Sequence, residues 1–134
     1  MLFSKATIFT AATALAGLVS AQSTKVHIVQ VSDKNGDLKF SPEELDAAVG
    51  DKVQFQFYPL DHSVARSNFA NPCVPLDPAT ANGTSGFFSG FMPVKQTDTF
   101  MPTFTIVVND TAPIWYYCAT GKHCEAGMAG VINA

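Results

Sequence analysis

Residues 115–130, W-Y-Y-C-A-T-G-K-H-C-E-A-G-M-A-G, place a cysteine, a histidine and a methionine on one short loop after an aromatic strand. Cys118, His123 and Met128 follow the spacing C-x4-H-x4-M. A blue copper site needs two histidines and a cysteine with a long, weak axial sulfur, and soft sulfur ligands favour copper over hard cations. His62, in D-H-S-V after an apolar strand, is the candidate for the second histidine. The pattern therefore predicts a mononuclear copper site with these four ligands.

Each proposed ligand has a simpler interpretation when it is considered alone. His62 could be an ordinary loop histidine, Cys118 a buried structural thiol and Met128 a core residue, because free cysteine and methionine are commonly buried. We favour the joint interpretation because the residue types and the spacing agree. Three other side chains are left outside the predicted site: His27, Met92 and Met101.

Four segments of the chain carry a resemblance to a known family. They are A-V-G-D-K-V-Q-F-Q-F at residues 48–57, D-H-S-V at residues 61–64, N-P-C at residues 71–73 and Y-C-A-T-G-K-H-C-E-A-G-M at residues 117–128. Together they resemble the phytocyanin-like blue copper proteins, and in particular the fungal extracellular cupredoxins. The resemblance implies an all-β, Greek-key β-sandwich or barrel of the cupredoxin type. It also implies one bound copper ion and the role of an electron carrier rather than an enzyme.

Secretion favours disulfide formation. If two of the three cysteines form a disulfide, one cysteine remains unpaired. The copper interpretation uses Cys118 as the thiolate. In the family that the chain resembles, a cysteine directly after the loop histidine is bridged to an earlier loop, and this implies a Cys73–Cys124 disulfide. A different pairing that leaves an idle thiol is the alternative.

Residues 1–21 have the features of a secretory signal peptide. Lys5 supplies the positive charge, an apolar run extends from Ile8 to Val19, and the small residues Ser20 and Ala21 precede a cleavage site before Gln22. We expect residues 22–134 to form a single cupredoxin domain that is secreted. Its expected location is extracellular, either free or associated with the cell wall. No other apolar run approaches the ~20 residues that span a bilayer. The sequence also lacks the hydrophobic tail of a lipid-anchor signal, so we expect no membrane span.

The charge of the chain argues against nucleic acid as a partner. Eight basic and eleven acidic residues give a formal net charge of −3, and no basic stripe is present. We expect a monomer that works with an extracellular redox partner of unknown identity.

Alternating apolar and polar residues predict several strands. Residues 25–31 are expected to form an edge strand in which the apolar Val26, Ile28 and Val31 alternate with polar residues, although Val29 breaks the strict alternation, and residues 52–58 are expected to form a core strand. Further strands are predicted at residues 99–108, 114–118 and 127–133. Asn35-Gly36 predicts a turn. Ser41-Pro42-Glu43-Glu44 has helix-start chemistry and favours one short helix to Ala48, although the family resemblance favours an extended segment there.

Residues 68–100 contain many prolines and glycines and predict a long irregular excursion that Cys73 ties down. Phe87, Phe88 and Phe91 are expected to form a second small core, with an exposed docking surface near the copper as the alternative. Asn82 and Asn109 begin two N-glycosylation sequons.

Enzyme functions fit the sequence less well. Three histidines in the whole chain are too few for a multicopper oxidase, and Gln22 rather than a histidine would begin the mature chain of a histidine-brace monooxygenase. A cysteine hydrolase would need an oxyanion site that the sequence does not suggest. Two alternatives to electron transfer stay open: copper sequestration, and a structural or binding role at the cell wall without redox turnover.

Overall fold

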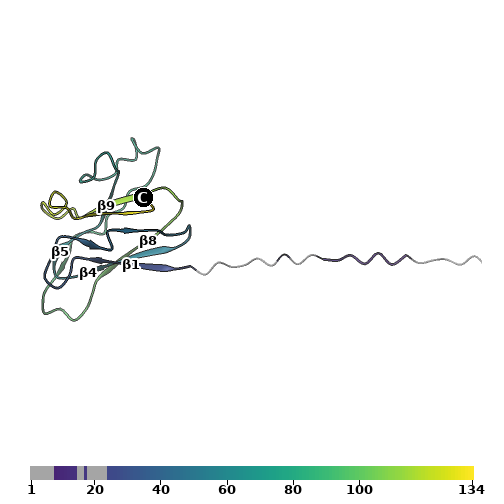
Figure 1. Ribbon diagram of the computed structural model, residues 1–134, viewed down its shortest axis with the longest axis horizontal. Coiled ribbons are helices and arrows are strands. Elements are labelled where there is room, and N and C mark those ends of the chain that lie inside the picture. Colours follow the sequence, from purple (N-terminus) through teal and green to yellow (C-terminus); the bar gives the residue numbers. More distant parts are fainter. Residues whose placement is uncertain (1–7, 15–16, 18–23) are drawn as a thin grey trace, which may run out of the picture.

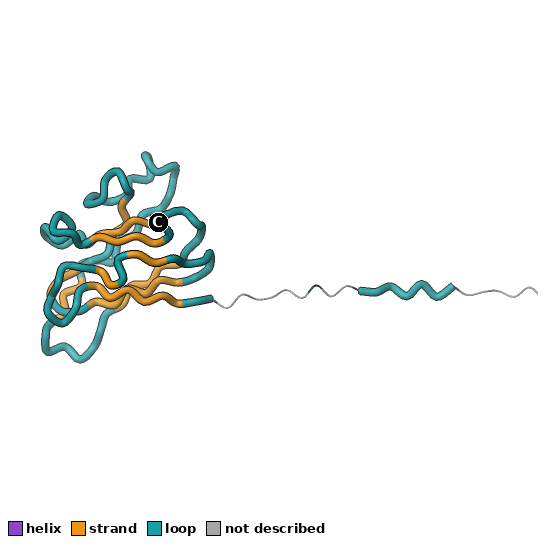
Figure 2. The backbone as a smooth tube through the Cα atoms, viewed as in Figure 1, coloured by secondary structure: helices purple, strands orange, loops and turns teal. Residues whose placement is uncertain are grey.

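The computed structural model describes residues 8–14, 17 and 24–134, and the predicted signal peptide and its cleavage site lie largely outside these residues. The described chain forms a β-sandwich (Figure 1). One sheet has the strand order β2-β1-β4-β8, the second β3-β10-β9-β6, and a small ribbon pairs β5 with β7. Figure 2 shows strands and loops but no helix in this part of the chain. Accordingly, no described helix could cross a membrane.

The strands of the first sheet are β1 (Val26–Val31), β2 (Phe40–Ser41), β4 (Lys52–Phe57) and β8 (Thr103–Val107). Those of the second sheet are β3 (Glu44–Leu45), β6 (Ala65–Ser67), β9 (Ile114–Tyr117) and β10 (Ala129–Ile132). The ribbon consists of β5 (Leu60–His62) and β7 (Met92–Val94). The predicted strands at residues 52–58, 114–118 and 127–133 are therefore confirmed to within two residues at either end, whereas the strand expected at residues 99–108 begins only at Thr103.

The core lies between the two sheets, and three aromatic rings join them. Phe40 of β2 and Phe55 of β4 each meet Tyr116 of β9 edge-to-face, with ring centroids 4.9 and 5.1 Å apart. All three side chains are at most 1% exposed. Edge-to-face contacts of this kind add to the free energy gained by burying the rings. The cluster thus fixes β9, which leads directly to Cys118, against the first sheet.

The alternation of apolar and polar residues in β1 does not identify its buried face. Val29 and Val31 are buried, whereas Val26 and Ile28 are about half exposed. The reason is the parallel register with β4, which pairs Val29 with Phe55 and so places both side chains on the core face. β1 is also not an edge strand, because it lies between β2 and β4. The apolar composition of β1 alone could not identify its buried face.

His27 lies on the inward-facing side of β1 but takes no part in the predicted metal site. Its Nε2 atom lies 2.9 Å from Asp51 Oδ2. The Asp51 carboxylate also accepts hydrogen bonds from the backbone N–H groups of Lys25 and Ala48. The bond with His27 and these backbone bonds lower the pKa of Asp51 below its ordinary value. His27 is therefore held by Asp51 on the first sheet.

The short helix expected after Ser41 is absent from the described chain: Ser41 ends β2, a bend follows at residues 42–43, and residues 44–45 form β3. β3 pairs with β10 in parallel, and two backbone N–H groups of the last strand region reach it: Val131 donates to the Glu43 carbonyl and Asn133 to the Leu45 carbonyl. In a helix, the backbone N–H and C=O groups of these residues would instead form hydrogen bonds with one another within the segment. Pairing with a distant strand outweighs the local helix propensity, and the extended segment implied by the family resemblance is confirmed.

The irregular excursion is confirmed, but the three phenylalanines in it do not form one core. Phe87 packs against the main core. Phe88 and Phe91 are 50% and 56% exposed, and their rings meet edge-to-face with centroids 5.4 Å apart. The expected second small core of these three residues is therefore wrong: Phe87 joins the main core, and the other two are exposed. The predicted Asn35-Gly36 turn is present, with Gly36 at a φ of 76° and its N–H bonded to the Asp33 carbonyl.

Gly130 of β10 should tolerate no side chain. It pairs with Tyr116, and a methyl group at position 130 would lie 2.5 Å from the Tyr116 ring and hydroxyl. We predict that Gly130→Ala lowers the free energy of unfolding by about 1–3 kcal/mol, because the buried ring must shift. Chemical denaturation of the variant would measure this.

Gly86→Ala is the matched control, since the nearest atom to a methyl group there is 3.7 Å away and an ordinary contact results. It should change the free energy of unfolding by less than about 1 kcal/mol. Equal stability of the two variants would contradict the predicted clash at Gly130.

Candidate metal centre

Two histidines and one cysteine converge at one end of the sandwich. His62 ends β5, Cys118 directly follows β9, and His123 lies on the turn between β9 and β10. The ligand-type atoms of the three side chains all lie within 4.8 Å of one another. Cys118 Sγ is 3.4 Å from His123 Nδ1, and the two imidazole centroids are 5.1 Å apart. The fold therefore joins His62 to two residues that follow it by more than fifty positions.

His62 is fully buried and has one ring nitrogen without a partner. Nε2 lies 3.1 Å from the Pro59 carbonyl, which only accepts, so Nε2 carries the proton and donates. Nδ1 is then an acceptor, and it has no hydrogen-bond partner among the described residues. Burial lowers the pKa of His62 below its ordinary value and favours the neutral imidazole. A neutral imidazole with a free, oriented lone pair is the form that binds a metal ion.

The Cys118 thiol is 1% exposed and surrounded by donors. Burial raises its pKa, but hydrogen bonds from Thr120, Ser63 and His123 outweigh burial, so the pKa is lower than that of an ordinary cysteine. One of these bonds is the backbone N–H of Ser63, 3.4 Å from Sγ. A thiolate is the species that binds metal ions, and this environment favours it.

Ser63 and Thr120 belong to the surroundings of the site, and sequence reasoning missed them. Ser63 Oγ accepts a hydrogen bond from the Ala119 N–H at 2.9 Å and lies 3.4 Å from Thr120 Oγ1. Ser63 thereby links the segment that carries His62 to the loop that carries the other ligands. Their position in the sequence could have identified them, because Ser63 directly follows His62 and Thr120 comes two residues after Cys118.

The ligand loop is closed by its own backbone and by a disulfide. The Cys118 N–H donates to the Met128 carbonyl at 3.1 Å, and the Met128 N–H donates to the His123 carbonyl at 3.0 Å. The predicted Cys73–Cys124 disulfide is present, with a Cα–Cα distance of 5.7 Å. Cys118 is the one free cysteine in the described part of the chain. The turn that carries His123 is therefore held both to β10 and to the long excursion.

The remaining predicted residues are placed as follows. Met128 is fully buried in the same hydrophobic cluster as Cys118, and its role as an axial ligand stays a prediction. Met92 pairs with His62 across the β5–β7 ribbon, whereas Met101 is 41% exposed. The two sequon asparagines, Asn82 and Asn109, are both exposed, and their glycosylation stays a prediction.

The chain is similar to two curated proteins. No protein-family model matches the sequence. The chain is 34% identical over 120 residues to the "Probable GPI-anchored cupredoxin-1" of Arthroderma benhamiae, a match that covers 90% of this chain and 55% of that protein. It is 35% identical over 122 residues to an "Extracellular serine-rich protein" of the same organism, covering 91% and 43%. The chain spans about half the length of the curated relatives it matches.

Solved structures share the fold. A mutant plastocyanin of a fern superposes with a TM-score of 0.56 at 21% identity, covering 78% of this chain and 96% of that one. Auracyanin A, a "blue" copper protein from Chloroflexus aurantiacus, gives a TM-score of 0.56 at 15% identity, covering 82% and 98%. At these identities the likeness concerns the fold, an all-β sandwich of the cupredoxin type.

The hydroxyl of Ser63 should contribute to the stability of the ligand loop. We predict that Ser63→Ala lowers the free energy of unfolding of the metal-free protein by about 1–3 kcal/mol, because the Ala119 N–H loses its partner. The exposed Ser85, whose hydroxyl makes no hydrogen bond in the described structure, provides the control variant Ser85→Ala. Denaturation curves for the two variants would be compared. The same stability in both would show that the Ser63 hydroxyl does not hold the loop.

Proposed function

Because the chain belongs to the cupredoxin family, we propose that it is a secreted, mononuclear type 1 copper protein that carries single electrons and is not an enzyme. The observation that carries the proposal is the convergence of His62, Cys118 and His123 within 4.8 Å. Two imidazoles and one thiolate are the strong ligands of blue copper sites.

The donor set fits a copper ion. His62 Nδ1 is buried and has no hydrogen-bond partner among the described residues, and the pKa of the Cys118 thiol is lower than that of an ordinary cysteine. These two residues and His123 would hold one ion, with Met128 as the weak axial sulfur. When bound, copper supplies a Cu(I)/Cu(II) couple that gains and loses one electron.

The protein's part in electron transfer is to keep the ligands in place in both oxidation states. The Cys118–Met128 and Met128–His123 backbone bonds, with the neighbouring disulfide, resist movement of the loop. His62 and Cys118 are buried and keep water from the thiolate, whereas His123 is partly exposed. His123 is therefore the proposed exit for the electron. The exposed Lys122 and Glu125 flank it on the surface.

The proposal includes the domain organisation and location predicted from the sequence. Residues 1–21 are the signal peptide and residues 22–134 the copper domain, glycosylated at Asn82 and Asn109. The printed names of the two curated relatives, one GPI-anchored and one extracellular, support an extracellular location, free or at the cell wall. The copper domain acts as a monomer with an extracellular redox partner.

Copper sequestration is the competing function, because it uses the same ligands without turnover. The electron self-exchange rate of the copper-loaded protein distinguishes the two. Rapid exchange at a steady reduction potential supports electron transfer. Slow exchange with tight, selective retention of Cu(I) would overturn it in favour of sequestration.

Cys118→Ser should abolish the thiolate-to-copper charge-transfer band after one equivalent of Cu(II) is added, because the band requires the thiolate ligand. Visible absorption and electron paramagnetic resonance spectra would measure the loss. The unfolding transition of the metal-free variant serves as its control for folding. An intense visible band that persists in Cys118→Ser would refute the type 1 assignment.

Met128→Leu should keep the band but raise the reduction potential, because it replaces a weak sulfur donor by an apolar group of similar volume. We expect a rise of at least about 59 mV, which is tenfold in a one-electron equilibrium constant. Cyclic voltammetry would measure the shift. Met92→Leu is the matched control and should leave the potential nearly unchanged, so equal potentials in the two variants would exclude Met128 as the axial ligand.

A further inference from the structure

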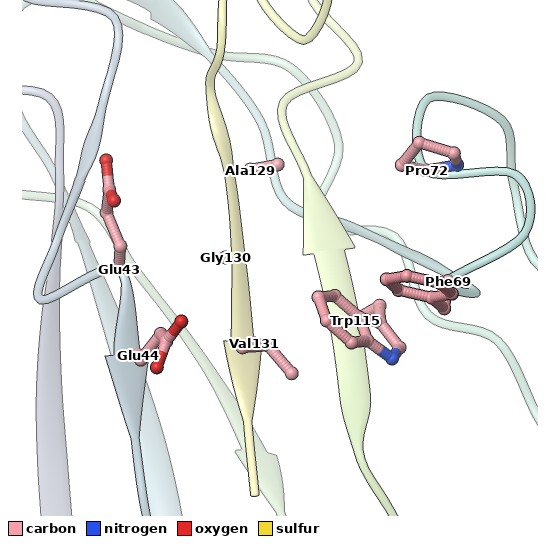
Figure 3. A pocket seen from close by; sticks show the side chains of 8 residues that line it. All are labelled: Glu43, Glu44, Phe69, Pro72, Trp115, Ala129, Gly130 and Val131. Carbon is pink, nitrogen blue, oxygen red and sulfur yellow. The ribbon is translucent and has the colours of Figure 1, made fainter. Parts of the chain in front are cut away.

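A shallow pocket of about 260 Å³ lies on the outer face of the second sheet, away from the residues of the metal centre. Figure 3 shows two glutamates, Glu43 and Glu44, on one side of β10, with Phe69, Pro72 and Trp115 on the other. The floor between them is the β10 segment of residues 129–131. Of its residues, Ala129 contributes a small side chain, whereas a side chain at Gly130 would point to the core face, toward Tyr116.

The sheet register brings the two sides of the pocket into one row. Glu44 pairs with Val131, and Val131 pairs with Trp115, so these three residues lie side by side across β3, β10 and β9. Paired residues point to the same face of a sheet. Neighbouring strands are about 4.8 Å apart, which puts the Glu44 and Trp115 backbones roughly 10 Å from each other. This space admits one ring-sized ligand over Val131.

The aromatic side of the pocket includes one largely exposed ring. Phe69 is 75% exposed, and its ring centroid is 5.1 Å from that of Trp115, with the ring planes at 52°. In Figure 3 the indole nitrogen of Trp115 lies on the side of the ring directed away from β10, so carbon atoms face the pocket. Aromatic faces carry negative charge density, which attracts C–H groups and cations. The wall therefore favours a ligand with a flat, weakly positive face.

The opposite side of the pocket is acidic. Glu43 and Glu44 are both exposed, and no lysine, arginine or histidine in the described part of the chain forms a salt bridge with either carboxylate. Figure 3 shows the Glu44 carboxylate directed toward β10. Two neighbouring carboxylates favour a positively charged ligand group.

We propose that this pocket binds an amine-bearing sugar. The C–H face of a pyranose ring stacks on Trp115 with the inclined Phe69 ring against its edge, and its protonated amino group lies against Glu43 and Glu44. A neutral sugar would leave the acidic side unmatched. A lysine side chain would match the charge but offers no flat face to the two rings. The combination of both sides therefore selects a ring that carries its own positive charge.

Trp115 is the only tryptophan of the chain, so its fluorescence reports directly on the pocket. The copper-loaded, reduced protein is titrated with a glucosamine tetramer, its fully N-acetylated counterpart and tetralysine, at a pH where the amines are protonated and the glutamates ionised. We expect a saturable change in fluorescence with the glucosamine tetramer and clearly weaker binding of the other two. Added salt should weaken the interaction, because exposed charge pairs are screened.

Two exposed side chains provide variants that leave the core intact. Glu44→Gln should weaken binding about two- to fivefold, the range of an exposed charge pair. Phe69→Ala should weaken it about two- to tenfold, the range of an aromatic contact. Glu125→Gln and Phe100→Ala change an exposed glutamate and an exposed phenylalanine outside the pocket and should bind as the unmodified protein does.

The unfolding transition of each variant checks that it is folded, independently of the copper site. Binding to the pocket is overturned by the absence of a saturable change, or by affinities that Glu44→Gln and Phe69→Ala leave unaltered. The sugar assignment is overturned if tetralysine binds as tightly as the glucosamine tetramer. The requirement for a free amine is overturned if the N-acetylated tetramer does so.

Discussion

The backbone hydrogen bond from the Cys118 N–H to the Met128 carbonyl is the constraint on which the metal centre depends. It continues the β9–β10 ladder to the point where the ligand loop leaves the sheet. Since β9 is held to the first sheet by the contact of Tyr116 with Phe40 and Phe55, the position of the thiol is determined by the core. The ligand loop then needs few contacts of its own, and the disulfide beside His123 supplies one of them.

The centre also explains polar atoms that would otherwise be costly. A buried acceptor without a partner, such as His62 Nδ1, destabilises a fold unless something binds to it. The Cys118 thiol in turn receives hydrogen bonds although it is buried among apolar side chains. Both features have a simple physical reason if the site holds a copper ion. The free energy of metal binding would then offset the cost of burying these groups.

Successive side chains of β9 point alternately into the core and to the outer face of the second sheet. Tyr116 points into the core and leads to Cys118, while Trp115 points to the outer face and forms the aromatic wall of the pocket. Gly130, opposite Tyr116, has to be small because the buried ring fills its place. On the outer face, the small side chain of the neighbouring Ala129 contributes to the shallow floor of the pocket. Constraints of the core and the shape of the outer surface are thus linked through β9 and β10.

The sequence by itself determined the ligand types and the spacing of Cys118, His123 and Met128, because these residues share one loop whose geometry is local. It also determined strands such as β4, whose alternation is regular. The resemblance to the cupredoxins implied the fold and the Cys73–Cys124 pairing. Only the tertiary structure decided that His62 lies beside the loop and that strand β3 replaces the expected helix. It also decided which face of β1 is buried and that Phe88 and Phe91 are exposed. These features depend on register between segments far apart in the sequence, and local propensity carries no information about such pairing.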